Sequence, residues 1–340
     1  MSDDETLPVA DALDGVPTPL DHTHMVGHNE ARQAFSRALA DDRLHHAWLL
    51  AGPRGIGKAT LALRLAAQVL AGTPDLPPPE HAIHSQMRRG GHPNLLYLSR
   101  TWDQKNKRFR TQLVVDDVRR INGLFAMTAG QGRRRVCIVD AADDMNPSAA
   151  NAILKTLEEP PRDALFLLVS HSPGRLLPTI RSRCRVLPMH PLGDAEVGTV
   201  VDHLGLGTNQ KELTAAVRLS EGSPRRAAQI LNGNVLKAYA QFRAAAEAER
   251  PDWAAVHALA DLVTAKRDAA DEALFYDLVF GWLGERVRAG GPPAALARWA
   301  DVWNKARETL DRAETFNLDR RQVLLDVFAS LFEANAALEH

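Results

Sequence analysis

A glycine-rich segment with a single lysine is the first place where residue types and spacing point to chemistry. It lies between an apolar run typical of a buried strand, residues 48–51, and an alanine- and leucine-rich helical pattern. In that context glycines let backbone N–H groups turn toward an anion, the helix N-terminus adds partial positive charge, and Lys58 reaches the outer phosphates. The segment predicts a phosphate loop made of Gly52, Pro53, Arg54, Gly55, Ile56, Gly57, Lys58, Ala59 and Thr60. A tight glycine turn without a ligand is the alternative.

Two positions that hydrolysis normally needs carry alanine. The residue after the lysine should offer a hydroxyl to Mg²⁺, but it is Ala59, and Thr60 follows one place too late on the helix to point the same way. Asp140 ends the apolar segment 136–139, where a second metal-holding carboxylate belongs, yet Ala141 stands where a glutamate would orient the attacking water. A capping or solvated carboxylate is the alternative for Asp140. We therefore predict ATP or ADP as a possible cofactor, with Mg²⁺ weakly bound or absent.

Composition limits the class of protein. A chain of 340 residues is long enough for two or three domains, and a net charge of −1 excludes a generally basic nucleic-acid binder. Two cysteines fit a reducing compartment, and no apolar run has the length that a bilayer requires. We expect a cytoplasmic protein without a membrane partner.

The elements that must position these residues alternate along the first half of the chain. Strands are expected at 48–51, 94–98, 136–139, 165–170 and 181–188, with helical patterns between them. Five such strands imply a parallel sheet covered on both faces, which is an α/β P-loop core. Residues 1–23 combine acidic side chains with prolines and predict a disordered tail. From residue 191 the pattern is helical almost throughout.

Several motifs in a fixed order resemble one family. They read GPRGIGK, VCIVDAAD, NAILKTLEEPP, LFLLVSHSP, LLPTIRSRC and EGSPRRA, and they span roughly residues 24–232. Together they resemble the AAA+ subunits of the bacterial DNA polymerase III clamp loader. The NAILKTLEEPP and SRC segments are far more specific than the phosphate loop alone. The motor subunits of that family keep a hydroxyl residue after the lysine and a glutamate after the aspartate, whereas this chain has Ala59 and Ala141 there. The chain is therefore most similar to the subunit type that has lost both groups and retains Ser-Arg-Cys.

The resemblance implies a domain order and two further site residues. It implies an AAA+ P-loop α/β domain at 24–189, an all-α lid domain at 190–232 and an all-α collar domain at 233–340 that joins subunits into a ring. Arg183 would be an arginine finger for ATP held by a neighbouring subunit, and Arg225 would sense the phosphates in this chain's own site. A solvated edge strand that carries Arg181, Arg183 and Arg185 is the alternative.

The implied partners are the motor subunits gamma/tau and the delta subunit, with the sliding clamp and primer-template DNA reached through the complex. The chain would help load the clamp during replication as part of the DNA-directed DNA polymerase holoenzyme, and ATPase activity would reside in the complex. An active gamma/tau-like ATPase motor is the alternative, and a small-molecule kinase is a weaker one. We expect no structural zinc, because residues 81–92 hold histidines and no cysteine.

Two basic places could contact nucleic acid. Residues 102–110 carry four basic side chains, a composition more typical of a solvated hairpin tip than of a phosphate contact. Arg119 and Arg120 lie on a helix that Asp116 is expected to cap.

Overall fold

The computed structural model describes residues 9–22, 24–89, 92–126, 134–206, 209–248, 250–265, 269–290, 292–316 and 318–336. The chain divides into two compact units, the first with residues 1–206 and 220–226 and the second with residues 207–219 and 227–340. The predicted disordered tail falls partly outside the described ranges, at residues 1–8 and 23. The proposed boundaries of a separate lid and collar stay a prediction.

A five-stranded parallel sheet forms the centre of the first unit, with the strand order β2-β5-β6-β1-β7. Its strands are β1 (Ala47–Ala51), β2 (Leu95–Leu98), β5 (Arg135–Val139), β6 (Ala164–Ser170) and β7 (Arg185–Pro188). In β1, Leu49 pairs with Leu168 of β6 on one side and Val186 of β7 on the other. Strands β1, β5 and β6 are buried along their whole length, as expected for a parallel sheet between two helical layers.

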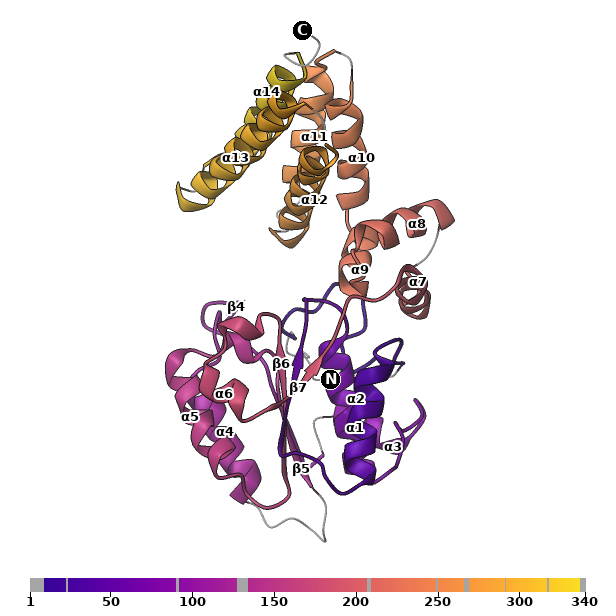
Figure 1. Ribbon diagram of the computed structural model, residues 1–340, viewed down its shortest axis with the longest axis vertical. Coiled ribbons are helices and arrows are strands. Elements are labelled where there is room, and N and C mark those ends of the chain that lie inside the picture. Colours follow the sequence, from indigo (N-terminus) through magenta and orange to yellow (C-terminus); the bar gives the residue numbers. More distant parts are fainter. Residues whose placement is uncertain are drawn as a thin grey trace, which may run out of the picture. The chain divides into compact units, whose positions relative to one another are not determined.

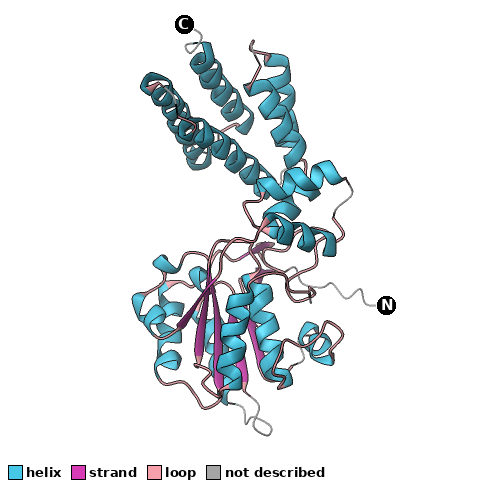
Figure 2. Ribbon diagram, turned by 45° about the vertical axis from the view of Figure 1, so that its right-hand side comes forward, coloured by secondary structure: helices cyan, strands magenta, loops and turns pink. Residues whose placement is uncertain are grey.

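Helices cover both faces of this sheet, so the predicted doubly covered α/β core is confirmed (Figures 1 and 2). One layer contains α1 (Asn29–Ala40), α2 (Lys58–Ala71) and α3 (Ala82–Arg88), and the other contains α4 (Val115–Ala126), α5 (Pro147–Glu158) and α6 (Pro178–Ser182). Trp48 and Leu50 pack into the first layer, whereas Leu49 and Ala51 pack into the second. Successive strand side chains point to opposite faces. Because all five strands run parallel, their carboxyl ends lie at one shared edge of the sheet.

Short elements differ in detail from the sequence prediction. Residues 102–110 form a hairpin of β3 (Trp102–Asp103) and β4 (Arg108–Phe109), as expected. Helix α4 begins before Asp116, and the Asp117 carboxylate accepts a hydrogen bond from the Val114 N–H at 3.0 Å. Helix α6 continues to Ser182, so β7 begins only at Arg185 and the strand predicted from residue 181 is shorter. Two 3-10 turns, η1 (Ala142–Asp144) and η2 (Pro173–Arg175), follow β5 and β6.

The second unit is helical, as predicted for the C-terminal half. It contains α8 (Gln210–Leu219), α10 (Val235–Ala246), α11 (Trp253–Ala265), α12 (Ala269–Arg288), α13 (Pro293–Phe316) and α14 (Arg320–Ala336). Helix α7 (Asp194–His203) belongs to the first unit, and α9 (Pro224–Asn232) begins there. The ring of Phe242 contacts those of Phe275, Trp282 and Phe328 at centroid separations of 6.2, 5.4 and 5.5 Å. None of the helices in the described part of the chain could cross a membrane.

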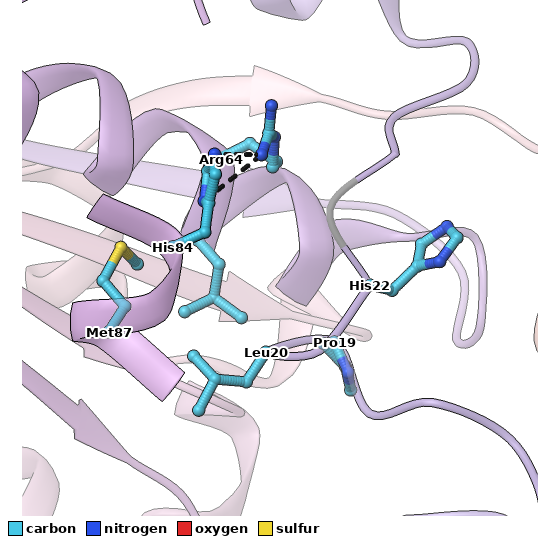
Figure 3. Close-up of a pocket in the computed structure, with 7 residues that line it drawn as sticks. Pro19, Leu20, His22, Arg64, His84 and Met87 are labelled. Atoms are coloured by element: carbon cyan, nitrogen blue, oxygen red, sulfur yellow. Dashed lines mark hydrogen bonds between the residues drawn. The ribbon is translucent and has the colours of Figure 1, made fainter. Parts of the chain in front are cut away.

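Residues 9–22 have a defined structure that the disordered-tail prediction did not include. The Ala12 N–H donates to the Val9 carbonyl at 3.2 Å, and Leu20 packs against the core beneath α2 and α3. Leu20 and His22 line a small pocket beside Arg64 and His84 (Figure 3). Arg64 bonds to the His84 Nε2 atom at 2.6 Å and also donates to the Pro77 carbonyl. The packing of Leu20 and the position of His22 place the N-terminal segment against the domain.

Candidate functional site

The glycine-rich loop joins β1 to α2 at the carboxyl edge of the sheet. Gly55 and Gly57 adopt φ values of +80° and +99°, a region that favours glycine. A Cβ atom at Gly55 would lie 2.3 Å from the Ser223 hydroxyl oxygen, and one at Gly52 would lie 2.2 Å from the Met189 carbonyl oxygen. Backbone conformation and close packing therefore both require the glycine at position 55, as a phosphate loop would.

Two neighbouring segments fasten this loop. The Arg225 N–H donates to the Gly55 carbonyl at 3.3 Å, which brings the predicted phosphate sensor to the loop. A ring nitrogen of His28, Nε2, lies 2.7 Å from the Ile56 carbonyl oxygen. Arg225 thus lies beside the loop as the sequence prediction requires, although its role in sensing nucleotide stays a prediction.

Lys58 is buried at the start of α2, with a relative exposure of 3%. Its ammonium donates to the Gly52 carbonyl at 2.7 Å and to the Pro53 carbonyl. Burial lowers the Lys58 pKa to about 8, although the negative charges of Asp140 and Asp143 act to raise it. A phosphate at the loop would favour the charged ammonium and compete with the two carbonyls for it.

Asp140 lies at the end of β5 and shares a short hydrogen bond with the neighbouring strand. Its carboxylate accepts from the Tyr97 hydroxyl at 2.5 Å. Burial raises the Asp140 pKa, while the Tyr97 hydrogen bond and the Lys58 charge act in the opposite direction. The Tyr97 hydroxyl therefore takes up one acceptor position of the carboxylate that a P-loop enzyme uses for magnesium.

The residues present fit a phosphate group better than a magnesium ion. Ala59 offers no hydroxyl, Thr60 is the next residue along α2, and Ala141 is buried without a polar side chain. Within the described ranges, no three His, Cys, Asp or Glu side chains are grouped to hold a metal ion. The site therefore has a loop and a lysine suited to phosphate but lacks the hydroxyl and glutamate typical of hydrolysis.

Asp143 is a structural residue of this edge that the sequence prediction did not single out. Its carboxylate accepts from the Ser170 hydroxyl at 2.9 Å, from the His171 N–H at 2.6 Å and from the Ser172 N–H at 3.1 Å. It thereby holds the end of β6 beside the phosphate loop. Its place in the VCIVDAAD motif, in the turn that follows β5, was the available signal.

Arg183 is the C-cap residue of α6 and lies outside any strand. Its guanidinium lies 2.8 Å from the Glu158 carboxylate and donates to the Thr179 carbonyl at 2.9 Å. These partners belong to α5 and α6 rather than to the phosphate loop. The Arg183 side chain is 33% exposed, so it is partly accessible.

The two arginines beside it are placed differently. The guanidinium of Arg185 stacks over the Trp48 ring at 4.8 Å, and Arg181 donates to the Pro173 carbonyl at 3.3 Å. Only Arg183 of these three forms an ion pair with the NAILKTLEEPP segment in the described structure. The three arginines thus have different contacts, and the trans role of Arg183 stays a prediction.

The basic positions considered for nucleic acid are exposed. In the hairpin, the Asp103 carboxylate accepts from the backbone N–H groups of Lys105 and Asn106 at 3.0 and 3.1 Å. Arg119 pairs with Asp116 on the solvent side of α4 at 2.8 Å. Both places have the local contacts of ordinary solvated turns and helices, and DNA contact there stays a prediction.

A parallel sheet of this order, with a glycine-rich loop and buried lysine at the end of β1, defines an AAA+ P-loop domain. Residues 27–193 match the family described as "DNA polymerase III, delta subunit". This part of the chain is a clamp-loader family domain close to the delta-prime type.

Named relatives agree with that assignment. The chain is 39% identical to DNA polymerase III subunit delta' of Pseudomonas aeruginosa over 58% of each chain. It is 35% identical to the Escherichia coli K12 subunit of the same name over 56% of each. Identity to the gamma subunit of Buchnera aphidicola is 28%, over 63% of this chain and 58% of that protein. The chain therefore matches a little over half the length of these relatives.

Solved structures are similar more loosely. The branch-migration motor RuvB of Thermotoga maritima has a TM-score of 0.47 at 17% identity, over 95% of this chain and 92% of that chain. A gamma-subunit-related protein of Thermotoga maritima has a TM-score of 0.44, also at 17% identity, over 90% and 99% of the two chains. At these values the assignment of the fold rests on the strand order and the loop.

Proposed function

We propose that this chain is a clamp-loader subunit of the delta-prime type, which helps place a sliding clamp on primed DNA. In the assembled ring it donates Arg183 to the ATP of a neighbouring motor subunit, and its own site binds nucleotide without hydrolysing it. The observation that carries the proposal is the location of Arg183: it is partly exposed and held by Glu158 and Thr179, not by its own phosphate loop.

The chemistry of a donated guanidinium supports this role. An arginine finger stabilises the charge of the transferring phosphoryl group and contributes about 10³ to 10⁵ in rate in general. Its planar donors match phosphate oxygens, which a lysine does not reproduce. The ion pair with Glu158 is half-exposed, and such pairs contribute at most about 1 kcal/mol. Releasing Arg183 to a neighbour therefore costs little.

The chain's own site would have a different role. The phosphates of ATP or ADP would be held by Lys58, Arg225 and the loop from Gly52 to Gly57. When bound, the phosphates would supply the negative charge that these residues neutralise. Ala59 and Ala141 leave no hydroxyl for Mg²⁺ and no carboxylate for an attacking water. We therefore propose that nucleotide bound at this site supports the structure of the chain and is not turned over. We also propose that the chain needs no zinc.

The expected partners are gamma/tau motor subunits and a delta subunit, in the cytoplasm, with clamp and primer-template DNA contacted through the complex. Helices from residue 233 onward would provide the collar. Trp253, which is 43% exposed at the start of α11, is one residue of that region available to a neighbour.

Assembly and turnover test the proposal together. The purified chain alone should hydrolyse ATP no faster than its Lys58→Ala variant. When it is mixed with the motor and delta subunits, it should co-elute with them in gel filtration and permit clamp-stimulated ATPase. Brisk turnover by the isolated chain would favour the active-motor alternative, and failure to enter the complex would exclude the delta-prime role.

A further inference from the structure

Three arginine side chains converge on one residue of the N-terminal segment. The Asp11 Oδ1 atom lies 2.5 Å from Arg54 Nη2 and 2.8 Å from Arg100 Nη2. Arg225 donates to the main-chain carbonyl of Asp11. The arginines come from separate elements: the phosphate loop, the segment after β2 and the start of α9. Separate parts of the chain thus direct positive charge at one point beside the loop.

This cluster suits a phosphate better than the carboxylate that it holds. Guanidinium groups bind phosphate through paired hydrogen bonds, and a terminal phosphate offers more charge and more acceptor oxygens than one carboxylate. Arg100 also lies 3.2 Å from the Asp144 carboxylate, which positions it without engaging all of its donors. The partly buried Arg100 side chain, 22% exposed, is therefore a preorganised anion ligand.

Asp11 itself is held as an anion in an unusual backbone conformation. Burial raises its pKa, but the charges of Arg54, Arg100 and Arg225 outweigh that effect and the pKa lies below the usual value. Its φ of +60° falls in the left-handed region, which aspartate and asparagine tolerate better than most residues. This backbone conformation accompanies a position of the Asp11 carboxylate beside the arginines.

We propose that Arg54, Arg100 and Arg225 form a Mg²⁺-independent site for the terminal phosphates of a nucleoside polyphosphate, and that the Asp11 carboxylate is its internal competitor. The inference rests on the proposed nucleotide binding at Lys58 and adds Arg100 as a ligand. Because Asp11 is tethered to the domain, its effective concentration at the site is on the order of millimolar. A polyphosphate must displace it, so the resting chain binds nucleotide more weakly than its loop alone would allow.

The first test is a titration of the full chain with mant-ATP in EDTA. Asp11→Asn keeps the size and the left-handed tolerance but removes the charge, and it should bind about tenfold more tightly than wild type. Asp41→Asn is the matched control, because Asp41 is an exposed aspartate just after α1, before β1 begins, and it should change nothing. Adding Arg100→Ala to Asp11→Asn should weaken binding by about tenfold.

A second readout follows the displaced segment. Sodium tripolyphosphate, which has no base or ribose, should increase amide hydrogen exchange in residues 9–22 of the wild-type chain. If ATP binds much more tightly than tripolyphosphate, the physiological ligand is a nucleotide; similar affinities would indicate a general polyphosphate site. Either result supports displacement, provided that exchange in residues 9–22 rises.

Two outcomes would overturn the inference, and they differ in their consequences. If Asp11→Asn binds mant-ATP no more tightly than wild type while Lys58→Ala abolishes binding, the nucleotide site stands and the internal competitor does not. If neither the wild type nor Asp11→Asn binds mant-ATP or tripolyphosphate, nucleotide binding fails as well. Donation of Arg183 in trans is then still tested independently by the ATPase of the reconstituted complex.

Discussion

The hydroxyl of Tyr97 donates to the Asp140 carboxylate at 2.5 Å, across adjacent strands β2 and β5. Where an active P-loop enzyme uses this carboxylate for a magnesium ion, here it is engaged by a neutral donor and its pKa is raised by burial. Together with Ala59, this bond supports our proposal that the chain binds phosphate without hydrolysing ATP.

Removing the Tyr97 hydroxyl should destabilise the domain through Asp140. Tyr97→Phe leaves a buried carboxylate without this donor, so the free energy of unfolding should fall by about 1–3 kcal/mol. The bond lowers the Asp140 pKa and so favours the charged form. The loss should therefore be greatest at neutral pH and should shrink as acid protonates the carboxyl group.

Tyr276→Phe is the matched control, because the buried Tyr276 hydroxyl has no hydrogen-bond partner in the described structure. It should change stability by much less than Tyr97→Phe in urea unfolding. Equal effects of the two substitutions would mean that the Tyr97–Asp140 bond contributes nothing specific.

Nucleotide affinity should be nearly independent of Mg²⁺. With no hydroxyl at position 59 and Asp140 engaged by Tyr97, the dissociation constant for mant-ATP should differ by less than about threefold between EDTA and excess MgCl₂. Ala59→Thr should introduce a preference for Mg²⁺, whereas Thr60→Ala should introduce none. A strong Mg²⁺ requirement in the wild-type chain would show that another metal ligand has been overlooked.

Lys58 should make nucleotide binding pH-dependent in a defined window. Its pKa is lowered by burial to about 8, and a bound polyphosphate should raise it. Between about pH 8 and pH 10, binding should therefore take up a proton, and affinity should fall as the pH rises. Calorimetry in buffers of different ionisation enthalpy measures this uptake. Near pH 7 the uptake from Lys58 should vanish, because the ammonium is already protonated in the free chain.

Gly55 should tolerate no side chain. Its φ is +80°, and an added Cβ would lie 2.3 Å from the Ser223 hydroxyl oxygen and 2.9 Å from the Arg225 Cβ. Gly55→Ala should cost about 3 kcal/mol of stability through backbone strain and crowding, and should weaken mant-ATP binding. Gly72 has a φ of +68°, but a Cβ added there would have no atom within 4 Å. Gly72→Ala therefore measures the cost of backbone strain alone, which should be about 1 kcal/mol of stability. Equal costs for the two would mean that contact with Ser223 is unimportant.

The central sheet could be predicted from sequence because most of its strands consist of apolar runs. Runs such as residues 165–169 have no polar face, and a sheet covered on both sides buries them. The phosphate loop was equally visible, since glycine spacing and a lysine are local features. Arg183 was singled out through a motif, but its place at the end of α6 was not, because the boundary between a five-residue helix and the strand after it has no clear local signal.

The contacts that give the site its character are not local. Tyr97 reaches Asp140 only because β2 and β5 are neighbours, which follows from strand order rather than from spacing. Asp11 meets Arg54 and Arg100 after the chain has returned to the same edge of the sheet. An acidic, proline-containing segment indicates disorder by composition, and composition does not reveal three arginines that can hold it.

Arg183 in a reconstituted clamp loader gives the most direct test of the central claim. The measurement is clamp- and primed-DNA-stimulated ATP turnover with this chain as wild type, Arg183→Ala, Arg181→Ala or Glu158→Gln. We predict that Arg183→Ala lowers turnover by at least about tenfold without preventing assembly, while Arg181→Ala and Glu158→Gln stay close to wild type. Full turnover with Arg183→Ala in a complete complex would contradict the account.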